Sequence, residues 1–213
     1  METATTATDG LRARKKRQTR AAIAAAAMDL FRSRGFDAVT IADIAAAADV
    51  SRKTVFNYFP AKEDLVFEAG QERRAALVQA IRERPPGTSL VAPFRAATMD
   101  YLDRVADDPI DATLAIPRLV AGSPALRNRL FLGWEEEAAV LGPVLAQEAG
   151  EPPDSVVPTV VARTLAWTHR TIFRAAFSRL LAGEDRDAVA TDLRAQATRA
   201  YDLLEDGLAG YGT

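Results

Sequence analysis

The segment 51–58 carries polar side chains whose chemistry suits the reading of nucleic acid. Its polar face consists of Ser51, Arg52, Lys53, Thr54, Asn57 and Tyr58. Arginine and lysine can donate to guanine, asparagine can pair with adenine, and threonine can touch the methyl group of thymine. The apolar side predicted to fix this helix from behind consists of Val55, Phe56 and Phe59. Periodicity alone also fits an ordinary short surface helix, so both interpretations stay open at this point.

The elements around this segment predict a helix-turn-helix at 40–59. Thr40, with Asp43 three residues later, is close to a capping box that begins a short helix. Ser51 caps the next helix, which Pro60 ends because a proline ring cannot continue the hydrogen-bond ladder. In a helix-turn-helix, the second helix enters the major groove and presents its N-terminal side chains to bases and phosphates.

Charge is distributed unevenly along the chain, although the formal net charge is only -2. Residues 10–62 hold 11 Lys+Arg and 4 Asp+Glu, a net charge of +7, which leaves a net charge of −9 on the remainder. A basic N-terminal module on an acidic body fits a local polyanion-binding site. We expect part of the basic run from Arg14 to Arg20, Arg17 included, to lie beside the duplex. A solvated charged tail is the alternative.

The composition argues against an enzyme. The chain of 213 residues has no cysteine and one histidine, so Cys-His triads and thiolate metal sites are absent. The acids Glu135, Glu136 and Glu137 occupy successive helical positions and point in different directions, which is typical of a solvated run. No glycine-rich phosphate loop occurs. We therefore expect no catalysis, no metal and no cofactor.

The expected location is the cytoplasm, with no membrane association. No apolar stretch approaches the roughly 20 residues that a membrane span needs. Residues 1–10 are small and polar, lack the apolar segment of a signal peptide, and are predicted to form a disordered arm.

A longer pattern is more specific than the short motifs. From Thr40 to Leu65 the chain reads TIADIAAAADVSRKTVFNYFPAKEDL, and AAMDLFRSRGFDAVT precedes it. This pattern resembles the TetR family of transcriptional regulators over about the first third of the chain. It departs from the family at Asp49, where glycine is usual, and at Asn57-Tyr58, where Tyr-His is frequent. Aspartate tolerates a left-handed backbone better than most residues, so we expect the turn to persist.

The resemblance implies an all-α protein of about nine helices. The arm over 1–10 would precede a three-helix DNA-binding domain over 11–60 and a ligand-binding and dimerisation domain over 61–213. In the family, the equivalents of Thr40, Tyr58 and Lys62 usually hold backbone phosphates. The groove-facing equivalents are Arg52, Lys53, Thr54 and Asn57.

The resemblance also implies a homodimer on a palindromic double-stranded operator. The two reading heads would lie about one DNA turn apart, roughly 34–36 Å. An effector would change that spacing through a shift of the fourth helix, about 62–84. The resulting function is a repressor released by a small hydrophobic or amphipathic effector; a ligand-sensing activator or adaptor of the same fold is the alternative.

Helical periodicity divides the C-terminal body into five further segments. They are predicted at about 90–106, 110–121, 124–149, 155–183 and 187–208, with Pro117 and Pro143 expected to kink or divide two of them. The resemblance places the dimer contact on the last two helices, about 155–208. Their apolar stripes are Val157, Val161, Leu165, Ile172, Phe173 and Leu180, then Val189, Leu193, Ala197, Tyr201 and Leu204. Part of each stripe can equally be intramolecular core.

The effector pocket is expected among the middle helices. Candidate walls are Phe94, Tyr101, Phe131, Trp134 and Trp167, and candidate partners for an anionic head group are Arg118, His169 and Arg170. Each aromatic residue can instead be ordinary core, and a lone histidine is more often a satisfied helix side chain or a surface group. The run IPRLVAGSPALRNRLFLGWEEE resembles an actinobacterial regulator subgroup with acyl-CoA-responsive members. The effector would then be an acyl-CoA or another hydrophobic molecule.

Overall fold

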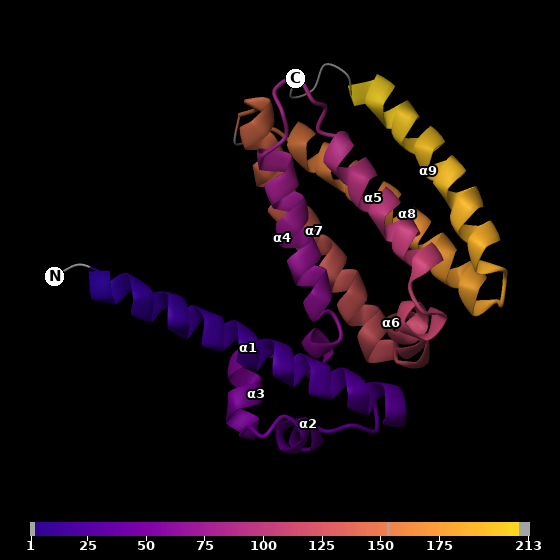
Figure 1. The fold of residues 1–213 in the computed structure, drawn as a ribbon. Coiled ribbons are helices and arrows are strands. Elements are labelled where there is room, and N and C mark those ends of the chain that lie inside the picture. Colours follow the sequence, from indigo (N-terminus) through magenta and orange to yellow (C-terminus); the bar gives the residue numbers. More distant parts are fainter. Residues whose placement is uncertain (1–2, 153, 209–213) are drawn as a thin grey trace. The chain divides into compact units, whose positions relative to one another are not determined.

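The structure, a computed structural model, describes residues 3–152 and 154–208, with the backbone alone for residues 3–13. Every regular element within these ranges is helical (Figure 1). The N-terminal elements are α1 (Thr3–Arg34), α2 (Ile41–Ala47), α3 (Arg52–Tyr58), η1 (Lys62–Leu65) and α4 (Glu68–Arg82). The later elements are α5 (Ala92–Asp107), α6 (Ile110–Gly122), α7 (Pro124–Ala149), α8 (Val157–Leu181) and α9 (Arg186–Leu208).

Element boundaries from α5 onward lie within about two residues of the predicted ones. The predicted fourth helix is divided into η1 and α4, which differs from the prediction. Of the two outcomes predicted for Pro117 and Pro143, division does not occur, since each lies inside one continuous helix. A proline inside a helix removes one backbone hydrogen bond, so the neighbouring turns can still hold the helix together.

Helix α1 begins at Thr3, so its backbone includes residues that the sequence assigned to a disordered arm. No proline occurs between residues 3 and 34, so nothing in the sequence stops the helix from extending backward. Residues 1 and 2 of the predicted arm lie outside the described part of the chain.

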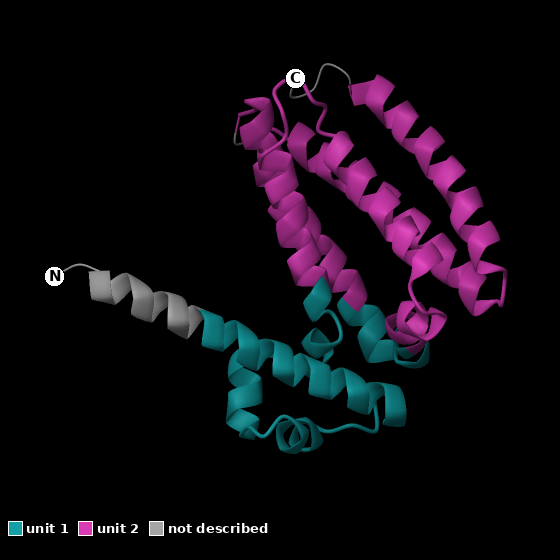
Figure 2. Ribbon diagram, viewed as in Figure 1, with its two compact units in different colours: residues 1–69, 119–129 teal, residues 70–118, 130–213 magenta. Residues whose placement is uncertain are grey.

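The chain forms two compact units (Figure 2). Unit 1 comprises residues 1–69 with 119–129, and unit 2 comprises residues 70–118 with 130–213. The first unit therefore extends beyond the predicted boundary at residue 60 and includes the junction of α6 and α7. Two polar contacts tie this junction to unit 1: the Ser123 hydroxyl donates to Asp37 at 3.1 Å, and Arg129 Nε donates to Asp64 at 2.7 Å.

The core of unit 1 forms where one face of α1 meets α2 and α3. Ile23, Ala27 and Phe31 are buried at helical spacing along one face of α1. Gly35 ends the helix with φ of 80°, and Phe36 then folds back so that its ring centroid lies 5.1 Å from that of Phe31. The remaining buried side chains of this core are Val39, Ile44, Ala45, Val55, Phe59, Leu65, Val66 and Leu126.

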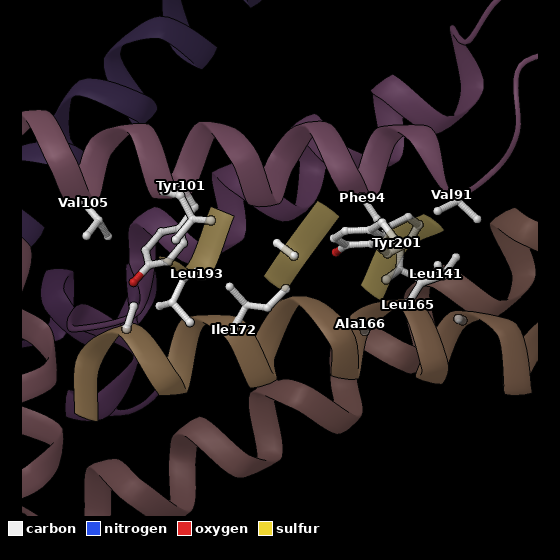
Figure 3. Packing of buried hydrophobic residues seen from close by; sticks show 14 of the residues in the cluster. Val91, Phe94, Tyr101, Val105, Leu141, Leu165, Ala166, Ile172, Leu193 and Tyr201 are labelled. Atoms are coloured by element: carbon white, nitrogen blue, oxygen red, sulfur yellow. The ribbon is translucent and has the colours of Figure 1, made fainter. Parts of the chain in front are cut away.

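The core of unit 2 lies between α5, α8 and α9, with α7 contributing from one side. Figure 3 shows Phe94 and Tyr101 pointing from α5 into the space above α8, where Leu165 and Ile172 meet them. Tyr201 of α9 is fully buried in the same cluster. Most residues of the two predicted stripes on α8 and α9 belong to this intramolecular core, so the outward faces of these helices carry other side chains.

Candidate nucleic-acid interface

The turn between α2 and α3 is built by local hydrogen bonds. The N–H of Asp49 donates to Ala46 at 3.3 Å and that of Val50 donates to Ala45 at 2.9 Å, the pattern of a Schellman motif. Asp49 has φ of 51°, the left-handed conformation that glycine usually supplies at this position. The prediction that aspartate would preserve the turn is confirmed.

Side-chain caps begin both helices of the motif. The Thr40 hydroxyl accepts from Asp43 N at 3.2 Å, and the Asp43 carboxylate accepts from Thr40 N at 2.8 Å, which completes the predicted capping box. Hydrogen bonds from the Thr40 hydroxyl and N–H hold the pKa of Asp43 below its ordinary value, with a smaller contribution from Arg34. At α3, the Ser51 hydroxyl accepts from Thr54 N at 3.0 Å.

Helix α3 presents a face that no other part of unit 1 covers. Arg52, Lys53 and Asn57 are exposed, and within the described residues none of the three makes an intramolecular side-chain hydrogen bond or ion pair. Val55 and Phe59 are fully buried on the opposite side, as predicted. Such a helix is anchored by its apolar side and leaves its donors available to a ligand.

The prediction for Phe56 is wrong. Its side chain is 51% exposed, because the helix has buried the positions at Val55 and Phe59, four residues apart. Position 56 lies about 100° around the helix from position 55, on the side of Arg52 and Lys53. Phe56 is thus an apolar member of the exposed face that hydrophobic pattern alone had assigned to the core.

Several residues assigned to phosphate contact have partners inside unit 1. The Lys62 ammonium donates to the carbonyls of Phe36 and Val39, both at 3.0 Å, and lies 4.1 Å from the centroid of the Phe36 ring. It therefore ties η1 to the loop before α2. The Thr40 hydroxyl donates to the Asp43 carboxylate at 2.6 Å, so its proton is engaged as well. A pattern of residue types cannot distinguish such internal donors from free ones.

The other polar residues at α3 are either hydrogen-bonded to each other or partly buried. The hydroxyls of Ser51 and Thr54 lie 2.7 Å apart and share a hydrogen bond. Tyr58 is half-buried at the last position of the helix, and its carbonyl accepts from Arg20 Nη1 at 2.7 Å.

The basic part of α1 separates into two groups. Arg14, Lys15, Lys16 and Arg17 are exposed, so their charges are available to a polyanion. Arg20 is instead paired with Glu68 inside unit 1, so it does not belong to the exposed part of the run. The side chain of Arg12 lies outside the described residues.

Comparison with known proteins decides the family. Residues 23–69 match the model of the bacterial regulatory proteins of the tetR family, and residues 88–209, more than half of the chain, match the MftR C-terminal domain. The chain belongs to the TetR family. TetR-family proteins are DNA-binding transcription regulators rather than enzymes, and α2 and α3 are the helix-turn-helix of this one.

Two TetR-family relatives show how far the similarity extends. The HTH-type transcriptional regulator TcmR of Streptomyces glaucescens is 30% identical over 146 residues, which cover 66% of this chain and 65% of that protein. This alignment spans just under two thirds of TcmR. The transcriptional regulator MftR of Mycobacterium tuberculosis (strain ATCC 25618 / H37Rv) is 24% identical over 198 residues, which cover 92% of this chain and 93% of that protein.

Solved structures share the TetR-family fold. NalD, the secondary repressor of the MexAB-OprM multidrug efflux pump in Pseudomonas aeruginosa, has a TM-score of 0.56 and 19% identity, covering 87% of this chain and 96% of NalD. SmeT of Stenotrophomonas maltophilia in complex with triclosan has a TM-score of 0.55 and 18% identity, covering 89% of this chain and 91% of SmeT. At these identities the similarity establishes the fold alone.

The residues predicted to line an effector pocket do not meet at one place in unit 2. Phe131, Trp134 and Trp167 form one aromatic group, with the Arg170 guanidinium 5.2 Å from the centroid of the Trp134 ring. Arg170 is buried and paired with Glu137 at 2.6 Å, so it is not a free cation. Arg118 is exposed and pairs with Asp111, and Phe94 is buried in the core.

A second aromatic group surrounds Tyr101. Its ring centroid lies 4.5 Å from that of Phe173 and 6.0 Å from that of Phe177. Tyr101 is 8% exposed, yet its hydroxyl has no hydrogen-bond partner among the described residues, and burial raises the pKa of that hydroxyl. An unsatisfied buried hydroxyl is costly, so this group is a candidate contact for a ligand.

His169 belongs to a hydrogen-bonded group in the core. Its Nδ1 lies 2.7 Å from the Thr98 hydroxyl, which also lies 2.7 Å from the Tyr201 hydroxyl and donates to the Phe94 carbonyl at 2.9 Å. Since that donation uses the only Thr98 proton, His169 and Tyr201 are the donors to Thr98. Burial lowers the pKa of His169 to about 4, so the ring is neutral at physiological pH.

The acidic run in α7 is occupied by ion pairs. Glu135 pairs with Arg163 at 2.7 Å and Glu137 with Arg170, so these carboxylates are not simply solvated as predicted. In the described part of the chain, no group of three His, Cys, Asp or Glu side chains could hold a metal ion. No described helix is both long and apolar enough to cross a membrane.

Proposed function

We propose that this regulator is a repressor that binds a palindromic operator as a homodimer and releases it when a small hydrophobic or amphipathic effector binds. The observation that carries the proposal is the uncovered face of α3, where Arg52, Lys53, Phe56 and Asn57 are exposed on a helix fixed from behind. Arginine, lysine and asparagine donors suit base edges in the major groove, and the exposed ring suits a thymine methyl group.

The outward faces of α8 and α9 support a homodimer. Trp167 is 42% exposed, Val160 is 58% exposed and Leu203 is 74% exposed, although all three are apolar. A groove of about 440 Å³ between these helices is lined by Trp167, Thr168, Thr171, Ile172, Leu193 and Ala200, among others. Positions 160, 164, 167 and 171 recur at helical spacing on α8, as do 193, 196, 200 and 203 on α9. A second copy of the chain would cover both faces.

The threonines of this groove do not oppose its burial. The hydroxyls of Thr164 and Thr168 donate to the carbonyls of Val160 and Thr164, each at 2.9 Å. Because these donors are satisfied within α8, the threonine side chains can present their methyl groups to a partner helix without a desolvation penalty.

The Tyr101 group supports an effector that combines apolar surface with a hydrogen-bonding atom. An acyl-CoA chain or a hydrophobic drug could pack against Phe173 and Phe177 while a polar atom pairs with the Tyr101 hydroxyl. We expect Tyr101→Phe to raise the free energy of unfolding by up to about 1 kcal/mol, because an unsatisfied hydroxyl leaves the core. The same substitution should reduce the thermal shift produced by an active effector, and an undiminished shift would remove Tyr101 from the effector site.

The test of the repressor proposal is selection of genomic DNA with the full chain. We expect enrichment of an inverted repeat near a promoter, and higher expression of the adjacent gene when the regulator is deleted. A thermal-shift series with acyl-CoAs and hydrophobic drugs, followed by mobility-shift assays, would identify effectors that release the DNA. Absence of any enriched sequence would contradict the proposal, and lower expression on deletion would favour an activator.

A further inference from the structure

Arg20 connects three elements of unit 1 through one side chain. From the middle of α1, its Nη1 donates to the carbonyl of Tyr58, the last residue of α3, at 2.7 Å. Its Nη2 donates to Glu68 Oε2 at 2.5 Å, and its Nε donates to Oε1 of the same carboxylate. The guanidinium carbon Cζ lies over the Phe59 ring, 4.4 Å from its centroid.

This arrangement satisfies the C-terminal end of α3. The last carbonyls of a helix have no intrahelical partner, and a helix of two turns has few hydrogen bonds of its own. The Tyr58 carbonyl receives a charged donor, which also interacts favourably with the negative end of the helix dipole. Phe59, the residue that follows the helix, is fully buried, and the guanidinium lies over its ring.

The geometry requires an arginine. Its guanidinium uses one edge for a bidentate pair with Glu68 and another donor for Tyr58, while its carbon lies over the Phe59 ring. A lysine ammonium carries the same charge but has neither the planar fork nor the face. The Arg20 side chain is 30% exposed and that of Glu68 is 16% exposed, so both are held within the unit.

We infer that Arg20 is a positioning residue for DNA recognition, which fixes the C-terminal end of α3 against the first residue of α4 and thereby aims the exposed face of α3. It would act without touching DNA. Asn57 and Phe56 are the two residues before Tyr58, whose carbonyl Arg20 holds. Their side-chain directions therefore depend most on Arg20. Glu68 is the first residue of α4, so Arg20 joins the beginning of α4 to the end of the reading helix.

The inference rests on the proposed operator binding, and salt dependence distinguishes it from a phosphate contact. A residue that neutralises a phosphate contributes to the slope of log affinity against log salt, whereas a positioning residue does not. We expect Arg20→Gln to weaken operator binding at least about tenfold with an unchanged slope. The matched control is Arg17→Gln, which replaces an exposed arginine one turn earlier on α1. It should reduce the magnitude of the slope of log affinity against log salt by about one for each protomer.

Arg20→Lys keeps the charge of arginine and therefore separates positioning from charge. We expect this variant to bind the operator as weakly as Arg20→Gln does. Affinities are measured well below the unfolding temperature of each variant, so that a loss of general stability does not contribute. Three results would each overturn the inference. They are wild-type operator affinity in Arg20→Lys, wild-type operator affinity in folded Arg20→Gln, and a salt dependence of Arg20→Gln that is reduced as in Arg17→Gln.

Hydrogen exchange of the DNA-free protein tests the same inference without an operator. The amide of Phe59 donates to the Val55 carbonyl at 2.9 Å and reports on the last turn of α3. We expect exchange at Phe59 to become at least about tenfold faster in Arg20→Gln than in the wild type or Arg17→Gln. Unchanged exchange would overturn the inference even if the operator assay failed, whereas failure of the wild type to bind any DNA would count against the proposed function alone.

Discussion

At the scale of single residues, partners inside unit 1 separate the side chains that can read DNA from those that connect its elements. Arg52, Lys53 and Asn57 have no side-chain partner within the described residues and face outward, whereas Lys62 and Arg20 donate to carbonyls of their own chain. The sequence pattern predicted DNA contact for Arg52, Lys53 and Lys62 alike. Only the tertiary structure, which brings distant carbonyls within 3.0 Å of Lys62, distinguishes the two roles.

Phe56 provides a test at this scale. Because its ring is half exposed, we expect Phe56→Ala to change the free energy of unfolding by no more than about 0.5 kcal/mol. A buried phenylalanine would cost about 3–5 kcal/mol on the same substitution. Operator affinity should fall by about tenfold, since an apolar contact to DNA is lost. Chemical denaturation and mobility-shift assays measure the two effects, and a large loss of stability with unchanged affinity would return Phe56 to the core.

His169 predicts a dependence of stability on pH. Its folded pKa of about 4 lies below the ordinary value of 6.5, so the unfolded chain binds the proton first as the pH falls. The contribution of His169 to stability is therefore complete above pH 6.5 and is lost as the pH falls toward 4. His169→Gln should lose less stability than the wild type over that interval, measured by denaturant unfolding at several pH values. Identical pH profiles would show that His169 titrates normally in the folded protein.

At the scale of elements, the helices were largely predictable and their partners were not. Capping residues, prolines and the 3.6-residue period are local signals, so the ends of α2, α3 and α7 agree with the sequence. The outward and inward faces of α8 and α9 could not be distinguished because both carry large apolar side chains. The predicted stripe through Val161 and Leu165 proved to be core, and the exposed face runs through Val160 and Trp167.

The exposed face of α8 predicts the effect of a charge at its centre. We expect Trp167→Asp to convert the proposed homodimer into monomers, because a buried aspartate in an apolar contact has no partner and tryptophan often dominates such interfaces. The matched control is Ile110→Asp, which replaces another exposed apolar side chain outside the groove and should leave the dimer intact. Sedimentation velocity distinguishes these outcomes, and a dimeric Trp167→Asp protein would place the contact elsewhere.

At the scale of the whole molecule, the net charge of +7 over residues 10–62 and of −9 elsewhere explains how an acidic protein can hold DNA. This asymmetry was visible in the sequence, as was the location of the reading helix. The effector was not, because its candidate side chains fall into separate groups that only packing defines. Electrostatic contacts from α1 and α3 of two protomers should make operator affinity fall steeply with salt, by about 10³-fold or more between 50 and 200 mM.

The most direct test of the central claim is a mobility-shift assay of the double variant Arg52→Ala plus Lys53→Ala on the selected operator. Both side chains are exposed and without side-chain partners within the described residues, so the variant should fold and dimerise as the wild type does. We predict that specific binding disappears while sedimentation velocity still reports a dimer. Wild-type operator affinity in this variant would contradict the assignment of α3 as the helix that reads DNA.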